Sequence, residues 1–164
     1  SATTTDTPTG PLTLVAEGER LVAGGFTDRL DDLRARLDPL RRAAEIHHRG
    51  DLGDISRAMA AYLEGDVTAL DGVPVEHAGT EGQRRVWAAL RKVPAGTTVS
   101  YGQLARMSGS PSAVRAAASA CGRNLIAPFV PCHRVVRRDG GLGGYAYGLD
   151  TKRWLLDHER ASTR

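Results

Sequence analysis

Cysteine is scarce in this chain of 164 residues, which contains only Cys121 and Cys132. Two cysteines cannot form the disulfide framework of a small secreted domain, and neither lies in the Cys-x-x-Cys pair that is typical of structural zinc sites. The sequence also lacks an apolar run of the roughly 20 residues that a membrane-spanning helix needs. We therefore expect a protein of the reducing cytoplasm that binds no metal and does not enter a membrane.

Acidic residues are sparse in the second half of the chain. Residues 81–164 contain 14 Lys and Arg but only 5 Asp and Glu, whereas residues 1–80 contain 8 and 14. A basic half is typical of a domain that contacts a polyanion such as nucleic acid. A solvated basic surface without a partner is the alternative that charge alone leaves open.

The first half of the chain has short apolar segments separated by turns. Residues 1–8 are expected to fray, and alternating apolar residues predict a two-stranded hairpin at 11–16 and 21–26. Helical periodicity follows over residues 27–39, where a proline should end it. A further amphipathic helix is predicted over residues 51–64.

Helix start signals mark the second half. Thr80 and Gln83 form a capping-box pattern ahead of an apolar helical stripe, and Ser100 and Gln103 repeat the pattern. These two signals predict two helices, each beginning directly after its capping residue.

A third helix is predicted over residues 111–123, because Ser110 is a favourable N-cap and Pro111 a favourable first helical residue. It follows its predecessor after a tight turn, and two short helices joined in this way predict a helix-turn-helix. Asp150 is predicted to cap the last helix of the chain.

The predicted fold class is α+β. Residues 1–76 are expected to form a small N-terminal α/β domain, with a short antiparallel sheet plus helices. Residues 77–164 are expected to form a mostly helical C-terminal domain that contains the helix-turn-helix and Cys132. A polar stretch at residues 71–78 is the natural place for the boundary.

Cys132 is the residue whose surroundings suggest chemistry, since Pro131 precedes it and His133 follows it. A free thiol has a pKa of about 8.5, and a nearby base or cation activates it as a nucleophile. Neighbours on a strand point to opposite faces, so His133 can assist Cys132 only where the backbone turns. From these residues alone, a nucleophile and a buried structural cysteine are both open.

The segment Pro131–Val135, with Asn124 upstream of it, resembles the active-site segment of the O6-alkylguanine-DNA alkyltransferases. Other matches occur at compatible spacings, so that the resemblance covers about half of the chain. The further matching segments are Gly79–Thr80, Gln83–Trp87, Ser100–Gly102, Ala113–Ala116, Gly143–Tyr145 and Leu155–Glu159.

The resemblance implies catalytic roles for five residues. Cys132 would accept the alkyl group, His133 would take the thiol proton through a bound water, and Glu159 would orient the imidazole. Tyr101 would help to protonate the leaving guanine, and Asn124 would join the recognition helix to the active-site segment. Standing alone, Glu159 would be interpreted as a solvated carboxylate near a helix end.

The resemblance also implies how DNA is held. Arg115 would enter the base stack in place of the flipped nucleotide, although without the resemblance a salt bridge on a buried alanine-rich helix is the favoured interpretation. Several small or polar residues would contact the DNA backbone and minor groove, and others would line the pocket for the flipped base. The expected DNA contacts are Arg115, Tyr101, Gly102, Ser110, Ala113, Ala116 and Arg138, and the expected base-pocket residues are Val135, Tyr145, Ala146 and Tyr147.

The implied reaction is DNA repair by direct, irreversible transfer of a methyl or other alkyl group from O6-alkylguanine, and by extension O4-alkylthymine, to Cys132. The partner would be double-stranded DNA, approached from the minor groove by a monomer in the cytoplasm, on the nucleoid in a bacterium. No cofactor is implied. The alternatives are a non-catalytic module that binds alkylated bases and a helix-turn-helix regulator; the presence of Cys132 argues against the first, and the alanines around Arg115 argue against the second.

Three positions depart from the resembling pattern. Gly82 stands where phenylalanine is usual, and Leu125 replaces the proline that usually follows the asparagine, which is expected to loosen that hinge. Tyr147 fills a position that is often small, so we expect it to narrow the pocket against bulky adducts such as benzyl.

Overall fold

The computed structural model describes residues 1–163, which form two compact units. Unit 1 contains Ser1–Ala78 together with Leu125–Phe129, and unit 2 contains Gly79–Asn124 and the residues from Val130 onward. The predicted boundary at residues 76 and 77 lies close to the first division. Sequence analysis did not anticipate that the segment Leu125–Phe129 would be grouped with unit 1.

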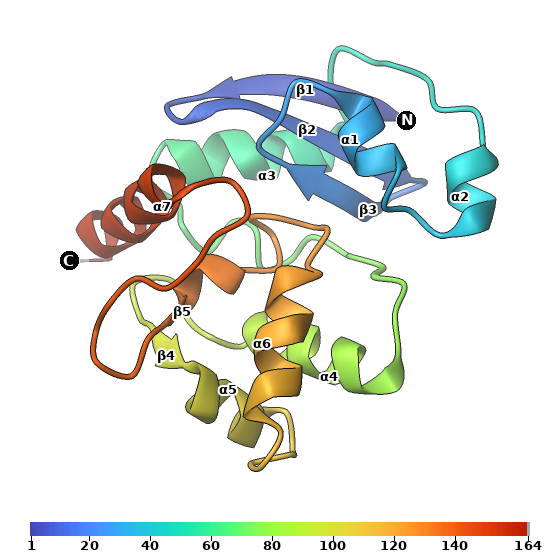
Figure 1. Cartoon of the computed structure of the whole chain (residues 1–164). Helices are drawn as coiled ribbons and strands as arrows, with labels where there is room; N and C mark the ends of the chain where they lie inside the picture. Colours follow the sequence, from blue (N-terminus) through green and yellow to red (C-terminus); the bar gives the residue numbers. More distant parts are fainter. Residues whose placement is uncertain (164) are drawn as a thin grey trace. The chain divides into compact units, whose positions relative to one another are not determined.

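Unit 1 is built on a three-stranded antiparallel sheet in the order β1-β2-β3 (Figure 1). The strands are β1 (Ala2–Thr7), β2 (Gly10–Glu17) and β3 (Arg20–Gly25). The prediction that residues 1–8 fray was wrong, because β1 pairs with β2 along its whole length. Its threonines are β-branched and suit a strand, and the hydroxyls of Thr4 and Thr13 hydrogen-bond across the pair at 2.9 Å.

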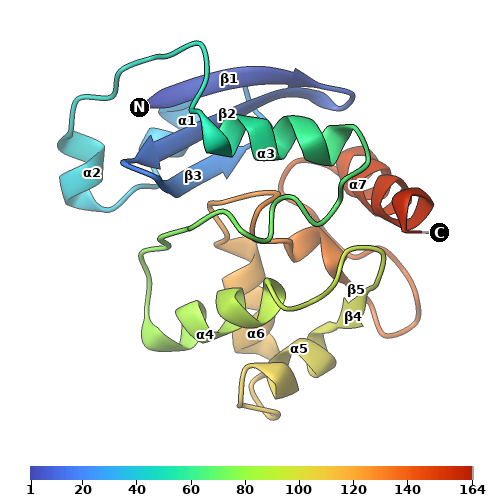
Figure 2. The same cartoon turned by 180° about the vertical axis from the view of Figure 1, so that it is seen from behind.

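The helices of unit 1 are shorter than predicted. They are α1 (Leu30–Arg34), α2 (Pro39–Ala43) and α3 (Asp54–Leu63). The periodic stretch 27–39 thus forms one short helix, and its proline begins the next one, at the helix position where a missing N–H is harmless. Figure 1 shows α1 in front of the strands, and Figure 2, the view from behind, shows α3 in front of them.

Unit 2 is mostly helical. Its elements are α4 (Glu81–Leu90), β4 (Val99–Ser100), α5 (Tyr101–Met107), α6 (Val114–Gly122), the 3₁₀ turn Cys132–Arg134, β5 (Val135–Val136) and α7 (Leu149–Ser162). Both predicted capping boxes are confirmed. The Thr80 hydroxyl accepts from the Gln83 N–H at 3.1 Å, and the Ser100 hydroxyl accepts from the Gln103 N–H at 3.1 Å.

Two helix starts in unit 2 differ from prediction. Helix α6 begins at Val114, not at residue 111, and Ser110 does not cap it; Ala113 has the non-helical ψ of 47° at the N-cap and receives no side-chain hydrogen bond. Helix α7 begins at Leu149, after Gly148, whose φ of 96° suits glycine. Asp150 therefore lies in the first turn, where its charge still favours the helix dipole.

Among residues 1–163, no helix combines the length and the apolar character that crossing a bilayer would require. Within the same residues, no three His, Cys, Asp or Glu side chains gather as metal ligands.

Candidate active site

Cys132 begins a 3₁₀ turn, as its proposed chemistry requires. The Cys132 N–H donates to the Val130 carbonyl at 2.9 Å, and the Arg134 N–H donates to the Pro131 carbonyl at 3.0 Å. The turn separates the environments of neighbouring side chains, since Cys132 is partly exposed whereas His133 is fully buried. The condition that the backbone turns at this cysteine is therefore met.

Asn124 ties the end of α6 to the segment that carries the cysteine. Its side-chain Nδ2 donates to the Val130 carbonyl at 2.7 Å, and the residue is only 4% exposed. This hydrogen bond agrees with the role that the resemblance implies for Asn124, which is to join the recognition helix to the active-site segment. It closes a loop, because Asn124 and Val130 are the residues on either side of Leu125–Phe129.

Three charged or titratable side chains, two of them from the residues that follow Cys132, meet in the interior. His133 Nε2 lies 2.8 Å from Glu159 Oε2, and Glu159 is fully buried. Arg134 donates two hydrogen bonds to the same carboxylate, from Nε to Oε1 at 2.8 Å and from Nη2 to Oε2 at 3.1 Å. The interpretation of Glu159 as a solvated carboxylate is thus wrong, and α7 delivers this side chain to the imidazole.

The electrostatics of this group determine where its proton lies. Burial raises the pKa of Glu159, but His133 and Arg134 outweigh that effect and hold the pKa below its ordinary value, so the carboxylate is ionised. Burial lowers the pKa of His133 against the opposing pull of Glu159, which favours neutral imidazole. An ionised Glu159 accepts a hydrogen bond from His133 Nε2–H, and this leaves Nδ1 as the basic nitrogen.

That remaining nitrogen is available for proton transfer. Among residues 1–163, His133 Nδ1 is buried and has no hydrogen-bond partner. A neutral imidazole that is oriented by a carboxylate and has its second nitrogen unengaged is able to accept a proton.

Arg134 and Lys152 are two buried cations that sequence analysis did not single out. Arg134 also donates from Nη1 to the Val93 carbonyl at 2.7 Å. The Lys152 Nζ donates to the carbonyls of Val135, at 2.7 Å, and Gly144, at 3.2 Å. A signal for Lys152 existed, because it lies seven residues before Glu159 and therefore on the same, otherwise apolar, face of α7.

Tyr101 and Cys121 lie in the electrostatic field of Cys132. Burial is the main cause that raises the pKa of Tyr101, followed by the charges of Cys121 and Cys132. Burial, with Cys132 second, raises the pKa of Cys121 to about 12, so that this thiol keeps its proton at neutral pH.

The glycine-rich loop after β5 lies beside Tyr101 and Lys152. A Cβ atom placed on Gly143 would lie 3.6 Å from the Tyr101 hydroxyl and 3.9 Å from Lys152 Nζ, which locates the loop beside both side chains. The Tyr145 ring packs edge-on against His133, with centroids 6.4 Å apart, and against Tyr147 at 5.7 Å.

The four expected base-pocket residues are therefore not equivalent. Val135 is buried and Ala146 is exposed, whereas Tyr145 and Tyr147 are partly buried. Tyr145 and Tyr147 together form an aromatic wall of this loop.

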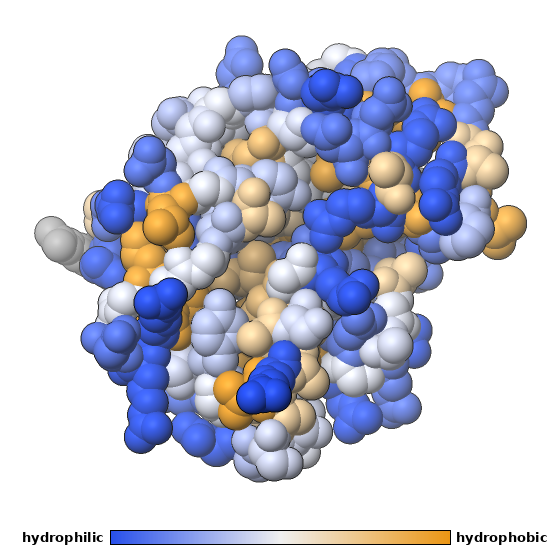
Figure 3. Space-filling model, viewed as in Figure 1, coloured by the Kyte–Doolittle hydropathy of each residue, from blue (hydrophilic) through white to orange (hydrophobic). Residues whose placement is uncertain are grey.

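Arg115 projects from α6 into solvent. Within the described part of the chain it makes no salt bridge, so the alternative of a buried helix with a paired arginine is not supported. Its neighbour Val114 and Met107 of α5 are two of the large apolar residues that remain exposed. Figure 3 shows such apolar atoms as small separate patches on a largely polar surface.

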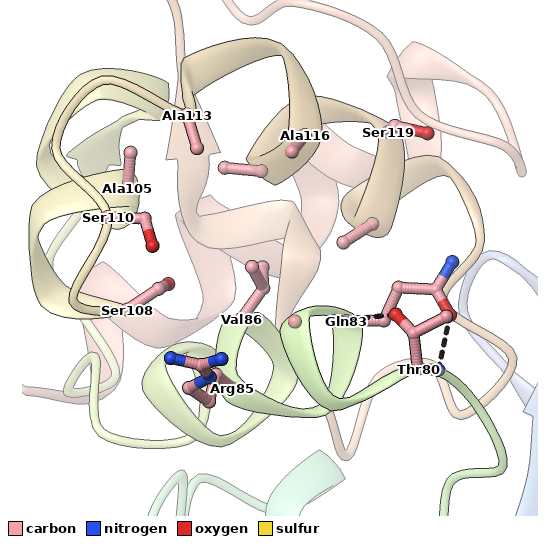
Figure 4. A pocket seen from close by; sticks show the side chains of 13 residues that line it. Thr80, Gln83, Arg85, Val86, Ala105, Ser108, Ser110, Ala113, Ala116 and Ser119 are labelled. Carbon is pink, nitrogen blue, oxygen red and sulfur yellow. Dashed lines mark hydrogen bonds between the residues drawn. The ribbon is translucent and has the colours of Figure 1, made fainter.

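The inner face of α6 holds Ala117 and Ala120, and the Trp87 indole donates to the Ala120 carbonyl at 2.9 Å. Beside this face, a hollow of about 290 Å³ lies between α4, the α5–α6 turn and α6 (Figure 4). Ser110, Ala113 and Ala116 line it, so these three expected DNA contacts share one surface. Gly82 also lines the hollow, where its missing side chain leaves open space.

Gly102 and Arg138 lie near the start of α5. Gly102 is in its first turn, and a Cβ there would approach only the Ser100 hydroxyl. Arg138 is exposed and borders a second hollow of about 380 Å³, together with Arg106 and Arg137. The positive charge of the second half of the chain is therefore concentrated, in part, beside the helix that carries Tyr101.

Comparison with known proteins gives a consistent result. The family model of the 6-O-methylguanine DNA methyltransferase DNA-binding domain matches residues 81–161. A methylated-DNA–protein-cysteine methyltransferase of Salmonella typhimurium is 38% identical over 162 residues, which cover 93% of this chain and 91% of that protein. A protein of the same name from Mycobacterium tuberculosis is 41% identical over 161 residues, covering 96% and 91%.

The fold comparison extends this similarity to both units. The crystal structure of Mycobacterium tuberculosis OGT in complex with DNA matches with a TM-score of 0.77 and 35% identity, covering 98% of this chain and 93% of that one. The agreement therefore includes the N-terminal residues that the family model does not reach.

Proposed function

The chain belongs to the methylated-DNA–protein-cysteine methyltransferase family, and we propose that Cys132 is the cysteine that accepts the alkyl group. The protein acts on double-stranded DNA that contains O6-alkylguanine and repairs it by direct alkyl transfer. The observation that carries the assignment is the buried group of Glu159, Arg134 and His133, two members of which directly follow the partly exposed Cys132 in the chain.

The first step is formation of the thiolate. His133 Nδ1 takes the thiol proton through a bound water, and Glu159 stabilises the resulting imidazolium through the 2.8 Å contact at Nε2. Arg134 keeps Glu159 ionised and in place, because its two nitrogens hold both carboxylate oxygens. Burial lowers the pKa of Lys152, while Cys132 acts in the opposite direction; when protonated, Lys152 adds a positive charge that favours the thiolate.

The second step is displacement at the alkyl carbon. The Cys132 sulfur forms a bond to that carbon as the bond between the carbon and guanine O6 breaks, and the bonding electrons stay with the guanine. Tyr101 supplies a proton to the leaving base. Because burial raises the pKa of Tyr101, its hydroxyl is protonated at neutral pH and able to donate.

The product is a thioether on Cys132, which water does not cleave under mild conditions. Each protein molecule therefore reacts once, and we propose that it acts as a monomer.

DNA engagement is assigned to α6 and the residues around it. Flipping a nucleotide out of the duplex costs a few kcal/mol of stacking and pairing, and a side chain that fills the gap offsets part of that loss. Arg115 is suited to this role because it is exposed, makes no salt bridge within residues 1–163, and lies on a helix whose other residues are mostly small. Such a helix can approach the narrow minor groove closely.

We assign the remaining roles as follows. Gly102, Ser110, Ala113, Ala116 and Arg138 contact the DNA backbone and groove, while Val135, Tyr145, Ala146 and Tyr147 receive the flipped base. A protein with this substrate works where the genome is, which in a bacterium is the cytoplasm, on the nucleoid.

The test is transfer of a labelled methyl group from duplex DNA containing O6-methylguanine. We expect one methyl per protein molecule, full transfer by Cys121→Ala, and no transfer by Cys132→Ala, which should still bind the duplex. Label that remains on DNA with the parent protein, or that reaches Cys132→Ala, would contradict the proposal.

A further inference from the structure

The segment Leu125–Phe129 connects Asn124 to the cysteine turn, but its own contacts are with unit 1. It belongs to unit 1, whereas its neighbours in the chain, Asn124 and Val130, belong to unit 2. The Asn124 side chain bonds the Val130 carbonyl at 2.7 Å, so both ends of the segment are fixed to each other. Cys132 follows two residues after Val130. The segment is therefore continuous in the chain with the residues from which the cysteine turn starts.

Gly24 of β3 holds the middle of the segment. The Gly24 N–H donates to the Leu125 carbonyl at 2.7 Å, and the Ala127 N–H donates to the Gly24 carbonyl at 3.0 Å. A Cβ atom on Gly24 would lie 2.8 Å from the Ala127 carbonyl oxygen, which is closer than a side-chain carbon can approach. The segment thus lies directly against the backbone of β3.

His77 holds the start of the segment. The Leu125 N–H donates to His77 Nε2 at 3.0 Å. Leu125 is 8% exposed, and its side chain packs into the core of unit 1, so its amide would otherwise be removed from water without a partner. This side-chain acceptor replaces a backbone acceptor at the one amide that immediately follows Asn124.

His77 can accept this bond only while its ring is neutral. Burial, assisted by the positive charge of Arg36, lowers its pKa to about 3. The ring therefore carries no charge at neutral pH, and Nε2 offers a lone pair to the amide.

We propose that His77 is a positioning residue for alkyl transfer, because it anchors the first residue of the segment that links Asn124 to the cysteine turn. The inference rests on the proposed function for its effect on chemistry. It assigns to unit 1 a defined contribution to the site, in addition to support. The expectation that leucine at position 125 loosens the hinge stays a prediction, and the hydrogen bond of the Leu125 N–H to His77 opposes such loosening.

The experiment compares His77→Ala, His77→Gln and the matched control His48→Ala, in the full chain. Glutamine can place an oxygen near the position of Nε2 and accept the Leu125 N–H, whereas alanine cannot. His48 is an exposed histidine of the same unit. Each protein is examined by hydrogen–deuterium exchange over residues 124–130 and by the rate of methyl transfer from duplex DNA, well below its unfolding temperature.

For His77→Ala we expect exchange at the Leu125 amide to be about tenfold faster or more, the scale set by leaving a buried donor without its acceptor. Transfer should slow, with exchange in β1 and β2 unchanged. His77→Gln should restore most of both properties, and His48→Ala should match the parent. Equal protection and equal rates in His77→Ala would overturn the inference, as would a glutamine variant no better than the alanine variant.

Repeating the test in the variant Leu125→Pro distinguishes loss of the hydrogen bond from general destabilisation of the fold. Leu125→Pro removes the N–H that His77 accepts, so His77→Ala should have little additional effect on the transfer rate in that background. Additive losses would overturn the inference. A parent protein that transfers no methyl would instead contradict the proposed function, and the exchange measurement would still report whether His77 anchors the segment.

Discussion

Replacing Glu159 with glutamine removes one charge from the buried group of His133, Arg134 and Glu159 while keeping the size of the side chain. The carboxylate accepts hydrogen bonds at both oxygens, from Arg134 Nε at Oε1 and from His133 and Arg134 Nη2 at Oε2. An amide in the same place presents its NH₂ group to one of these donors in either orientation. At least one hydrogen bond is therefore lost, and the imidazolium loses its counter-ion.

The expected loss follows from these contacts. A hydrogen bond to a charged partner contributes about 1.5–3 kcal/mol, so the transfer rate should fall about 10- to 100-fold if the imidazolium forms in or before the transition state. Arg134, 3% exposed, would keep its charge without a carboxylate. Breaking a buried pair in this way costs about 3 kcal/mol or more, which corresponds to a fall in Tm of roughly 6–12 °C.

The assay is single-turnover methyl transfer, measured over a range of pH at a temperature where both proteins are folded. The parent rate should change little around neutral pH. The variant rate should rise toward the ordinary thiol pKa of about 8.5, because hydroxide then replaces the lost assistance of His133. Asp157→Asn is the matched control, since Asp157 lies on the same helix with its side chain 66% exposed. A Glu159→Gln rate within twofold of the parent, with the same pH profile, would refute the reasoning.

Three further predictions concern other parts of the molecule. Arg115→Ala should slow repair of duplex DNA by about tenfold or more while leaving reaction with free O6-benzylguanine unchanged, because only the duplex substrate requires a base to be flipped; equal losses on both substrates would contradict this role. Tyr147→Gly should speed inactivation by O6-benzylguanine, as the pocket widens, and a rate no faster than the parent would reject the narrowing effect. Acid should destabilise the fold through His77, because the pKa of this side chain is about 3 in the folded state and 6.5 ordinarily. Below about pH 6.5 the unfolded chain therefore binds a proton that the folded chain does not. The free energy of unfolding should fall by about 2 kcal/mol by pH 5. The measurement is urea unfolding over a range of pH. His133 acts in the same direction, so the contribution of His77 is the part of the pH dependence that disappears in His77→Gln. An unchanged pH dependence in that variant would contradict the lowered pKa of His77.

Local signals in the sequence predicted local structure well where the side chain itself forms the hydrogen bond. Thr80 with Gln83 and Ser100 with Gln103 are such cases, since each pair is three residues apart. Ser110 carries the same chemical signal but fails, because the backbone at Ala113 leaves the helical region and moves the start of α6. Strand β1 was missed because its order depends on pairing with β2, which no window of residues 1–8 contains.

The same distinction applies to the site. Resemblance to a family identified Cys132, His133 and Glu159, but the contacts that hold them come from residues far apart in the chain. Arg134 reaches Glu159 across 25 positions, and Lys152 reaches Val135 across 17. His77 reaches Leu125 across 48. Each of these is a buried or partly buried polar pair whose partners are identified only once the chain is folded.

The central claim, that Cys132 receives the alkyl group, can be tested most directly by peptide mapping after reaction with duplex DNA containing O6-methylguanine. Cleavage after arginine separates the two cysteines, because Cys121 lies in the peptide 116–123 and Cys132 in the peptide 124–134. We predict one added methyl group on the peptide 124–134 and none on 116–123, at one equivalent per protein molecule. Methyl on the peptide 116–123, or on neither peptide while the lesion disappears from the DNA, would contradict the account.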